Sequence, residues 1–241
     1  MKELALKDLN VLITGGNKGI GLALSKKLIQ QGANVYSLSR TAYNHSTDES
    51  DNFKKHFHQY KCDITSILQL QSAFSEIKAA VSNIDILINN AGISDFNPFS
   101  ESDLSLAEKI IQTNLIAAIN LTHFILPDMI ENHKGMIVNI TSISVKENFA
   151  NCSVYNASKS GLISFSRSLR KEVRTKGIKI IDIIPGATLT DLWDDESKHQ
   201  YQNQMMLPDD VSEVIYECIR LSMNERMMIE EIIITPQNGN L

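Results

Sequence analysis

Short apolar runs alternate with segments of helical periodicity along almost the whole chain. The apolar runs have strand length, end at turn residues, and occupy positions 9–14, 34–39, 60–63, 84–88, 135–141, 178–184 and 232–234. Helical periodicity marks the segment from the first glycines to 31, then 67–81, 104–132, 153–176 and a segment opened by Pro208. Strands that alternate with helices need crossover connections, so the pattern predicts a parallel sheet with helices on both faces. Pro127 is expected to kink or break the segment 104–132.

Length, charge and cysteine spacing narrow the class of protein. The 241 residues contain no linker beyond a polar surface loop at 42–52, which favours a single domain, 1–241. The net charge is −5 and no basic stripe is visible, so no nucleic-acid partner is expected. Acidic residues near the N-terminus argue against a signal peptide. No apolar run approaches the roughly 18 residues that a membrane-spanning helix needs, so no membrane segment is expected. Cys62, Cys152 and Cys218 are widely spaced, which favours a cytoplasmic location and no metal site.

Glycines follow the first predicted strand in the run Thr14-Gly15-Gly16-Asn17-Lys18-Gly19-Ile20-Gly21. A turn of this kind needs positive φ angles and a backbone that a pyrophosphate can approach closely, which a Cβ would block. The N-terminus of the next helix then offers free N–H groups to the phosphate. A glycine-rich turn can also bind nothing, but its place at the head of an alternating α/β chain favours a dinucleotide.

The end of the second predicted strand indicates which dinucleotide would bind. An NAD site usually has an acid here for the ribose 2′-OH, whereas this chain has Ser39 and Arg40. A guanidinium binds two phosphate oxygens at once, and Lys18 could add a second positive charge. Both cations could instead be solvated surface residues. Their position favours NADP(H) over NAD(H).

Tyr155 and Lys159 stand four residues apart in a predicted helix and therefore share one face. A nearby ammonium is expected to lower the pKa of the tyrosine and make it a general acid or base, although the pair could also be a surface tyrosine beside a solvated lysine. Ser142 follows the fifth predicted strand, where ligands of open α/β sheets bind. It lacks the sequence context of a hydrolase nucleophile. Asn114 lies inside a predicted helix, where asparagine has poor propensity and tends to need a specific partner.

In order and spacing, these motifs resemble those of the short-chain dehydrogenase/reductase family over nearly the whole chain. The matching pieces are the glycine turn, Asp63, Asn89-Asn90-Ala91-Gly92, Asn114, Ser142, Tyr155-x-x-x-Lys159 and Pro185-Gly186-x-x-x-Thr190. The resemblance implies a single-domain Rossmann fold with a doubly wound, seven-stranded parallel sheet. It also implies an NADP(H)-dependent oxidoreductase that interconverts a small carbonyl compound and its alcohol.

The resemblance further implies a role for each residue of the site. Tyr155 would be the acid/base, Lys159 would lower its pKa and bind the nicotinamide ribose, and Ser142 would polarise the substrate oxygen. Asn114 would hold a water that links Lys159 to a proton relay, and Asp63 would meet the adenine. The cofactor would contact Gly15, Asn17, Lys18, Gly19, Ile20, Gly21, Ser39, Arg40, Asp63, Ile64, Asn90, Ala91, Gly92, Tyr155, Lys159, Pro185, Gly186, Thr188 and Thr190.

Two departures from the family pattern concern the substrate side and the subgroup. Val145 stands where many members have a glycine three residues after the serine, and this change is expected to reshape the loop 143–151. The run 234–238 resembles the 3-hydroxy acid dehydrogenase and sepiapterin-reductase-like branch. The segment 190–207 would cover the substrate, and Asp194 and Asp195 in it disfavour an anionic one. Apolar candidates for the substrate walls, each of which could equally be ordinary packing, are Phe96, Phe99, Phe149, Trp193, Tyr201, Met205 and Met206.

Other functions remain open from the sequence. A catalytically silent NADP(H) sensor would not need all of Asn114, Ser142, Tyr155 and Lys159, and an epimerase or dehydratase would need a larger substrate domain than this length allows. The resemblance also implies a homodimer or homotetramer formed through the helices 104–132 and 153–176.

Overall fold

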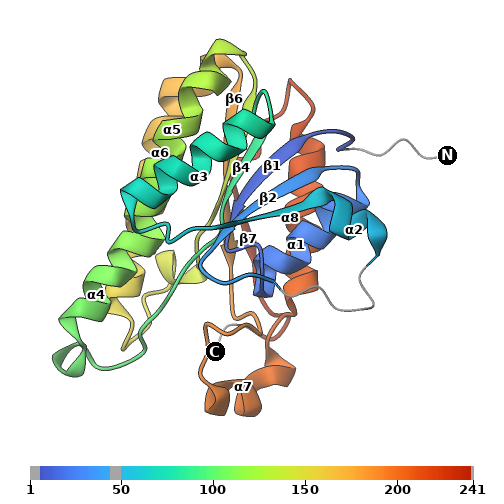
Figure 1. Ribbon diagram of the computed structural model, residues 1–241. Coiled ribbons are helices and arrows are strands. Elements are labelled where there is room, and N and C mark those ends of the chain that lie inside the picture. Colours follow the sequence, from blue (N-terminus) through green and yellow to red (C-terminus); the bar gives the residue numbers. More distant parts are fainter. Residues whose placement is uncertain (1–5, 44–49, 240–241) are drawn as a thin grey trace.

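The computed structural model describes residues 6–43 and 50–239. Seven parallel strands form one sheet in the order β3-β2-β1-β4-β5-β6-β7, with helices on both faces (Figure 1). The strands are β1 (Asn10–Thr14), β2 (Asn34–Ser39), β3 (Phe57–Lys61), β4 (Ile86–Asn89), β5 (Gly135–Ile140), β6 (Ile178–Pro185) and β7 (Glu231–Ile234). The helices are α1 (Gly19–Gln30), α2 (Asp51–His56), α3 (Ile67–Ala80), α4 (Leu104–Ile111), α5 (Ala117–Glu131), α6 (Ser153–Val173), α7 (Asp195–Tyr201) and α8 (Pro208–Ser222). The predicted doubly wound, seven-stranded Rossmann fold is confirmed.

The central strands bury side chains on both faces of the sheet. Val11 and Ile13 of β1 pack with Leu24 and Leu28 of α1 in a core that also includes residues of α8. Leu12 points the other way, into a core built with α3, α5 and α6. A strand covered on both faces has a continuous apolar sequence, which is why β1 was recognisable as a short buried run.

The strand order reverses at β1, which pairs with β2 on one side and with β4 on the other. The connections from these strands diverge to opposite faces and leave a crevice at the carboxyl ends of the strands. The glycine turn after β1 and the segments after β4, β5 and β6 therefore meet at one edge of the sheet.

The third strand differs from its prediction. It spans Phe57–Lys61, so Asp63 lies beyond it, and it follows directly on α2, which was not predicted. β3 is an edge strand with several half-buried polar side chains, which hides the apolar pattern. Ser50 starts α2 by accepting a hydrogen bond from the Phe53 N–H. The predicted loop 42–52 falls mostly on residues outside the described part of the chain.

Pro127 does not break the helix that contains it. α5 continues through Pro127 to Glu131, so the prediction of a break is wrong. Pro127 and His123 are both exposed, and the carbonyl that loses its N–H partner can bond to water on that side. The interruption lies earlier, at the π-helical turn Gln112–Ile116, which contains no proline. Such turns are frequent at functional sites, and this one contains Asn114.

One helical stretch in the described residues, Leu104–Glu131, is long and apolar enough to cross a membrane by length and composition alone. The sequence pattern predicts no membrane segment, so this stretch differs from that prediction by length and composition. Of its most apolar window, with a mean hydropathy of 1.3, 39% is buried inside the structure. Leu121, Ile125 and Met129 pack against the sheet, and the core helix of a globular protein passes the same test.

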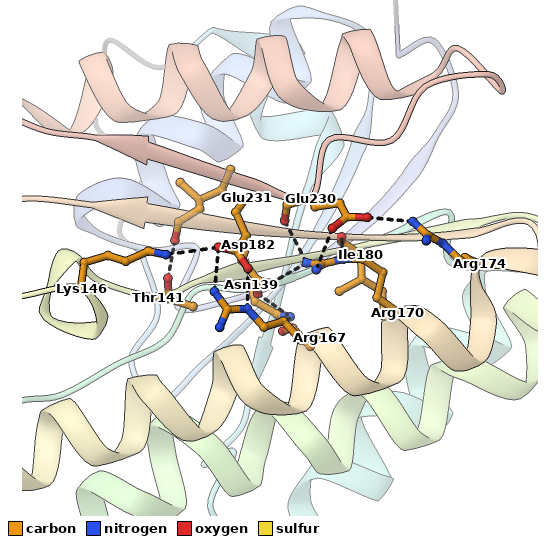
Figure 2. Close-up of polar contacts among 12 residues, drawn as sticks. Asn139, Thr141, Lys146, Arg167, Arg170, Arg174, Ile180, Asp182, Glu230 and Glu231 are labelled. Atoms are coloured by element: carbon orange, nitrogen blue, oxygen red, sulfur yellow. Dashed lines mark hydrogen bonds and ion pairs between the residues drawn. The ribbon is translucent and has the colours of Figure 1, made fainter.

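A buried polar network connects the sheet to α6 away from the crevice. Figure 2 shows Arg170 reaching from α6 toward Asp182 on β6 and Glu230 beside it. The Arg170 guanidinium donates to the Asp182 carboxylate at 2.7 Å and to the Ile180 carbonyl at 2.9 Å. Asn139 of β5 donates to Ser166 at 2.7 Å. Because Asp182 is fully buried, its charge depends on these partners.

Candidate active site

The glycine turn has the backbone geometry that the sequence predicts. Gly15 has φ +69° and Gly19 has φ +52°, values that residues with a Cβ rarely adopt. A Cβ on Gly21 would overlap the Gly15 carbonyl oxygen, so glycine allows α1 to start close against the turn. The first residues of α1, Gly19 and Ile20, line the cavity described below, where a helix N-terminus can bind a phosphate.

The segment after β4 is fastened to this turn. The Asn90 side chain donates to the carbonyl oxygens of Thr14 at 2.9 Å and Gly15 at 3.2 Å. The backbone N–H groups of Asn90 and Ala91 both donate to Thr14 Oγ1 at 3.0 Å. The Asn90 amide thus holds the turn in place, a structural task that complements its predicted place beside the cofactor.

The cations after β2 and on α4 gather near Asp63. A hydrogen bond from Thr65 lowers the pKa of the Asp63 carboxyl, and the charges of Arg40 and Lys109 lower it further. Arg40 and Lys109 both line the cavity described below. Sequence analysis missed Lys109, because a lysine on an amphipathic helix looks like an ordinary solvent-facing residue.

Lys18 lines the same cavity and pairs with an acid that follows β6. Its ammonium pairs with Asp191 at 3.2 Å, and both side chains are largely exposed. Asn17 donates to the Thr41 carbonyl at 2.7 Å, which fixes the turn to the segment after β2. Arg40 and Lys18, the two cations expected to bind a 2′-phosphate, therefore both line the cavity, and Lys18 also forms an ion pair with Asp191.

Ser142, Tyr155 and Lys159 come together where β5 and α6 meet. Ser142 follows β5, and its Oγ accepts the Ser144 N–H at 3.2 Å. Tyr155 lies in the first turn of α6, and Lys159 lies one turn later with its Nζ 5.9 Å from the Tyr155 ring centroid. The Lys159 ammonium donates to the Ile140 carbonyl at 2.8 Å. The four-residue spacing on one helix face thus places both groups beside the serine.

Asn114 is buried behind this group and does not line the cavity. Its Oδ1 accepts the Ile93 N–H at 2.9 Å, and its Nδ2 donates to the Ile93 carbonyl at 2.9 Å and to Ser158 Oγ at 3.0 Å. Asn114 therefore ties the segment after β4 to α6. The specific partner that its place within a helix suggested is the backbone of Ile93.

The pKa values differ from the sequence expectation. Burial raises the pKa of Tyr155 to about 12, against a hydrogen bond with Ser142 that lowers it. Burial lowers the pKa of Lys159 to about 8. The expected lowering of the Tyr155 pKa is therefore wrong for this structure, because desolvation of the buried hydroxyl outweighs the hydrogen bond with Ser142. Tyr155 stays protonated at neutral pH and can donate a proton.

One cavity of about 1040 Å³ connects these groups. It follows the carboxyl edge of the sheet, because Arg40 follows β2, Ala91 follows β4, Ser142 follows β5 and Thr188 follows β6. All of the predicted cofactor contacts line it except Gly21, which lies beneath the turn. The glycine cradle, the volume and the cations near Asp63 fit a dinucleotide phosphate together with a small substrate.

The substrate walls are only partly those that the sequence suggested. Phe96, Phe149 and Trp193 line the cavity, together with Ser94, Cys152 and Leu192, which were not singled out. Phe99 and Tyr201 do not line it, and Met205 and Met206 are buried packing residues. Met206 joins the core below α8, so for both methionines ordinary packing is the correct interpretation.

Within residues 6–43 and 50–239, no group of three His, Cys, Asp or Glu side chains is placed to hold a metal ion. Asp194 starts α7 by accepting the Ser197 N–H at 2.8 Å, and Asp195 pairs with Lys198 at 2.7 Å. Neither acid lines the cavity. Neither acid can therefore contact a substrate within this cavity.

Comparison with known proteins agrees with this geometry. The sequence model of the short chain dehydrogenase family matches residues 9–201, so the chain belongs to that family. Ketoacyl reductase HetN of Nostoc sp. is 35% identical over 180 residues, which cover 73% of this chain and 62% of that protein. NADP-dependent 3-hydroxy acid dehydrogenase YdfG of Escherichia coli is 30% identical over 216 residues, or 86% of this chain and 87% of that one. The closed form of serine dehydrogenase complexed with NADP+ is 25% identical, with a TM-score of 0.85 over 97% of each chain.

Proposed function

We propose that this protein is an NADP(H)-dependent oxidoreductase that interconverts a small carbonyl compound and its alcohol. One observation carries the proposal: a protonated Tyr155 beside Ser142 and Lys159 shares a single cavity with a phosphate-binding glycine turn. Family membership supports it, because relatives include a ketoacyl reductase and an NADP-dependent hydroxy acid dehydrogenase. A silent sensor would not need this set of proton-handling residues around the cavity.

The residues would act together on the substrate oxygen. The nicotinamide, when bound, supplies a hydride to the carbonyl carbon in reduction and takes one up in oxidation. Ser142 Oγ and Tyr155 Oη hydrogen-bond the carbonyl oxygen, and Tyr155 gives it a proton as charge develops. The Lys159 ammonium stabilises the phenolate that is left. Because Tyr155 is protonated at neutral pH, it can supply this proton in the reduction.

NADP(H) is the proposed cofactor. Arg40 and Lys109 stand near Asp63, and no acid follows β2 to accept the ribose 2′-OH of NAD. The relatives support this choice, since YdfG is NADP-dependent and the serine dehydrogenase structure is complexed with NADP+. The residues that would hold the adenosine end are Ser39, Arg40, Lys109 and Asp63.

The experiment that tests the activity follows NADPH and, separately, NADH oxidation with ketones, α-diketones, quinones and 3-oxoacyl esters. Arg40→Ala is expected to raise KM for NADPH about tenfold, since one charge-assisted hydrogen bond is worth about 1.5–3 kcal/mol and an exposed one less. KM for NADH should change little.

Arg226→Ala is the matched control for Arg40→Ala, because Arg226 is exposed and outside the cavity. Equal use of NADH and NADPH by the native protein would show that the role given to Arg40 is wrong. NADPH binding without turnover of any carbonyl would favour the sensor instead.

The segment 190–207 is proposed to cover the substrate, and the protein is proposed to be a homodimer or homotetramer. Leu192 and Trp193 already line the cavity, and α7 stands apart from the sheet layers (Figure 1).

The proposed oligomer would form through the helices 104–132 and 153–176. In the single chain, 39% of the most apolar window of Leu104–Glu131 is buried. Sedimentation at micromolar concentration should show a species of twice or four times 27.0 kDa, and a single 27.0 kDa species would contradict the oligomer.

A reducing, cytoplasmic compartment is also proposed. Cys62, Cys152 and Cys218 are buried and form no disulfide. Burial raises the pKa of all three thiols, which keeps them in the unreactive thiol form.

A further inference from the structure

An aromatic wall stands beside the catalytic tyrosine. Phe96, from the segment after β4, stacks on Trp193 with ring centroids 5.3 Å apart and planes inclined by 12°. The Phe96 ring also lies 6.5 Å from the Tyr155 ring. The exposed fraction of Phe96 is 38%, so much of its ring is open to the cavity. Phe96 and Trp193, called the Phe96–Trp193 wall below, thus offer a flat apolar surface close to the Tyr155 side chain.

The wall is held in place by polar contacts at its back. The indole N–H of Trp193 donates to the Thr188 carbonyl at 3.1 Å, which occupies the only polar atom of that side chain. Ser94 Oγ donates to the Leu192 carbonyl at 3.2 Å and so joins the two segments that carry the rings. Across the cavity, Asn156 donates to the Phe149 carbonyl at 3.3 Å and holds that segment. The substrate end is therefore preformed and mainly apolar.

Positive charge is confined to other parts of the cavity. Among the described residues, the cations that line it are Lys18, Arg40, Lys109 and Lys159. Arg40 and Lys109 are near Asp63, and Lys18 pairs with Asp191. Lys159 is buried and donates to the Ile140 carbonyl. In the described part of the chain, none of these four cations makes a cation–π contact with Phe96, Phe149 or Trp193, so the wall itself presents no cation to a substrate carboxylate.

We propose that the substrate is an uncharged ketone or aldehyde with a flat apolar group that lies on the Phe96–Trp193 wall, and that carboxylate substrates are rejected. The inference rests on the carbonyl reductase activity proposed above and specifies its substrate class. It separates this protein from relatives whose names indicate hydroxy acids. A carboxylate placed at this wall would lose water without gaining a partner, whereas an aromatic ring gains a stacking surface.

A matched pair of ketones tests the charge rule. Methyl 4-acetylbenzoate and 4-acetylbenzoate have the same ring and ketone and differ in one negative charge. With NADPH, kcat/KM for the ester is expected to exceed that for the acid by about tenfold or more, because the site leaves the carboxylate unpaired. Phe96→Ala is expected to lower kcat/KM for the ester about tenfold, mainly through KM, and to affect butanone less. Phe99→Ala is the control, since that exposed ring does not line the cavity.

Binding can be followed separately from turnover. Trp193 is the only tryptophan in the chain, so its fluorescence reports contact at the wall. In protein loaded with NADP+, the ester should quench this fluorescence at lower concentration than the acid. If the acid is reduced or bound as well as the ester, the substrate class is wrong while the reductase activity stands. If the ester quenches Trp193 but no carbonyl is ever reduced, the proposed reaction is wrong and the binding preference stands.

Discussion

Tyr155→Phe is expected to lower kcat for NADPH-dependent carbonyl reduction by about a thousandfold, within the 10²–10⁴-fold range for loss of a general acid. The substitution removes only the hydroxyl, which is the proton donor placed beside Ser142. The ring is 7% exposed and its packing is kept by phenylalanine, so the fold should survive. Initial rates of NADPH oxidation on the best ketone of the panel measure the effect.

Tyr60→Phe is the matched control, because Tyr60 lies on the edge strand β3 and does not line the cavity. NADPH affinity should change little in Tyr155→Phe, which separates loss of chemistry from loss of binding. If Tyr155→Phe kept more than a tenth of the native kcat, another group would have to donate the proton, and the role proposed for Tyr155 would be wrong.

Arg170→Met is expected to lower the free energy of unfolding by about 3–5 kcal/mol at pH 8, the cost of breaking a buried ion pair by removing one partner. The Asp182 carboxylate is fully buried and receives its 2.7 Å ion pair from Arg170 (Figure 2). Methionine fills much of the same volume but leaves that charge without a cation. Urea unfolding followed by circular dichroism measures the change.

The effect of Arg170→Met should depend on pH in a defined direction. Burial already raises the pKa of Asp182 to about 6 with Arg170 present, and without the cation it rises further. As the pH falls from 8 to 5, the variant can protonate Asp182 and shed the buried charge. Its destabilisation relative to the native protein should therefore be smaller at pH 5 than at pH 8.

Two further variants isolate the cause. Arg174→Met removes an exposed arginine that pairs with Glu230 at 2.7 Å, and should cost less than about 1 kcal/mol. Adding Asp182→Asn to Arg170→Met removes the unpaired charge and should restore part of the lost stability at pH 8. A pH-independent loss that Asp182→Asn does not relieve would mean that packing, not the buried charge, makes Arg170 important.

Much of the fold can be predicted from local sequence patterns, because the conformation of each of these segments depends mainly on residues close to it along the chain. The buried strand β1, the positive φ angles of Gly15 and Gly19, and the shared face of Tyr155 and Lys159 are all set within a few residues. Motif order extended this to the sheet and to the expected cofactor contacts, all of which line the cavity except Gly21. The edge strand β3 was misplaced because polar, half-buried side chains do not repeat the apolar pattern.

By itself, the sequence determined the alternating architecture, the glycine turn after β1 and the shared helix face of Tyr155 and Lys159, since these rest on backbone conformation and helical spacing. Only the tertiary structure decided what depends on contacts between distant segments. It brought Lys109 to Asp63, stacked Phe96 on Trp193, and joined Asn114 to the backbone of Ile93. It also reversed the expected pKa shift of Tyr155, because desolvation depends on how deeply the packed chain buries a group, which spacing does not reveal.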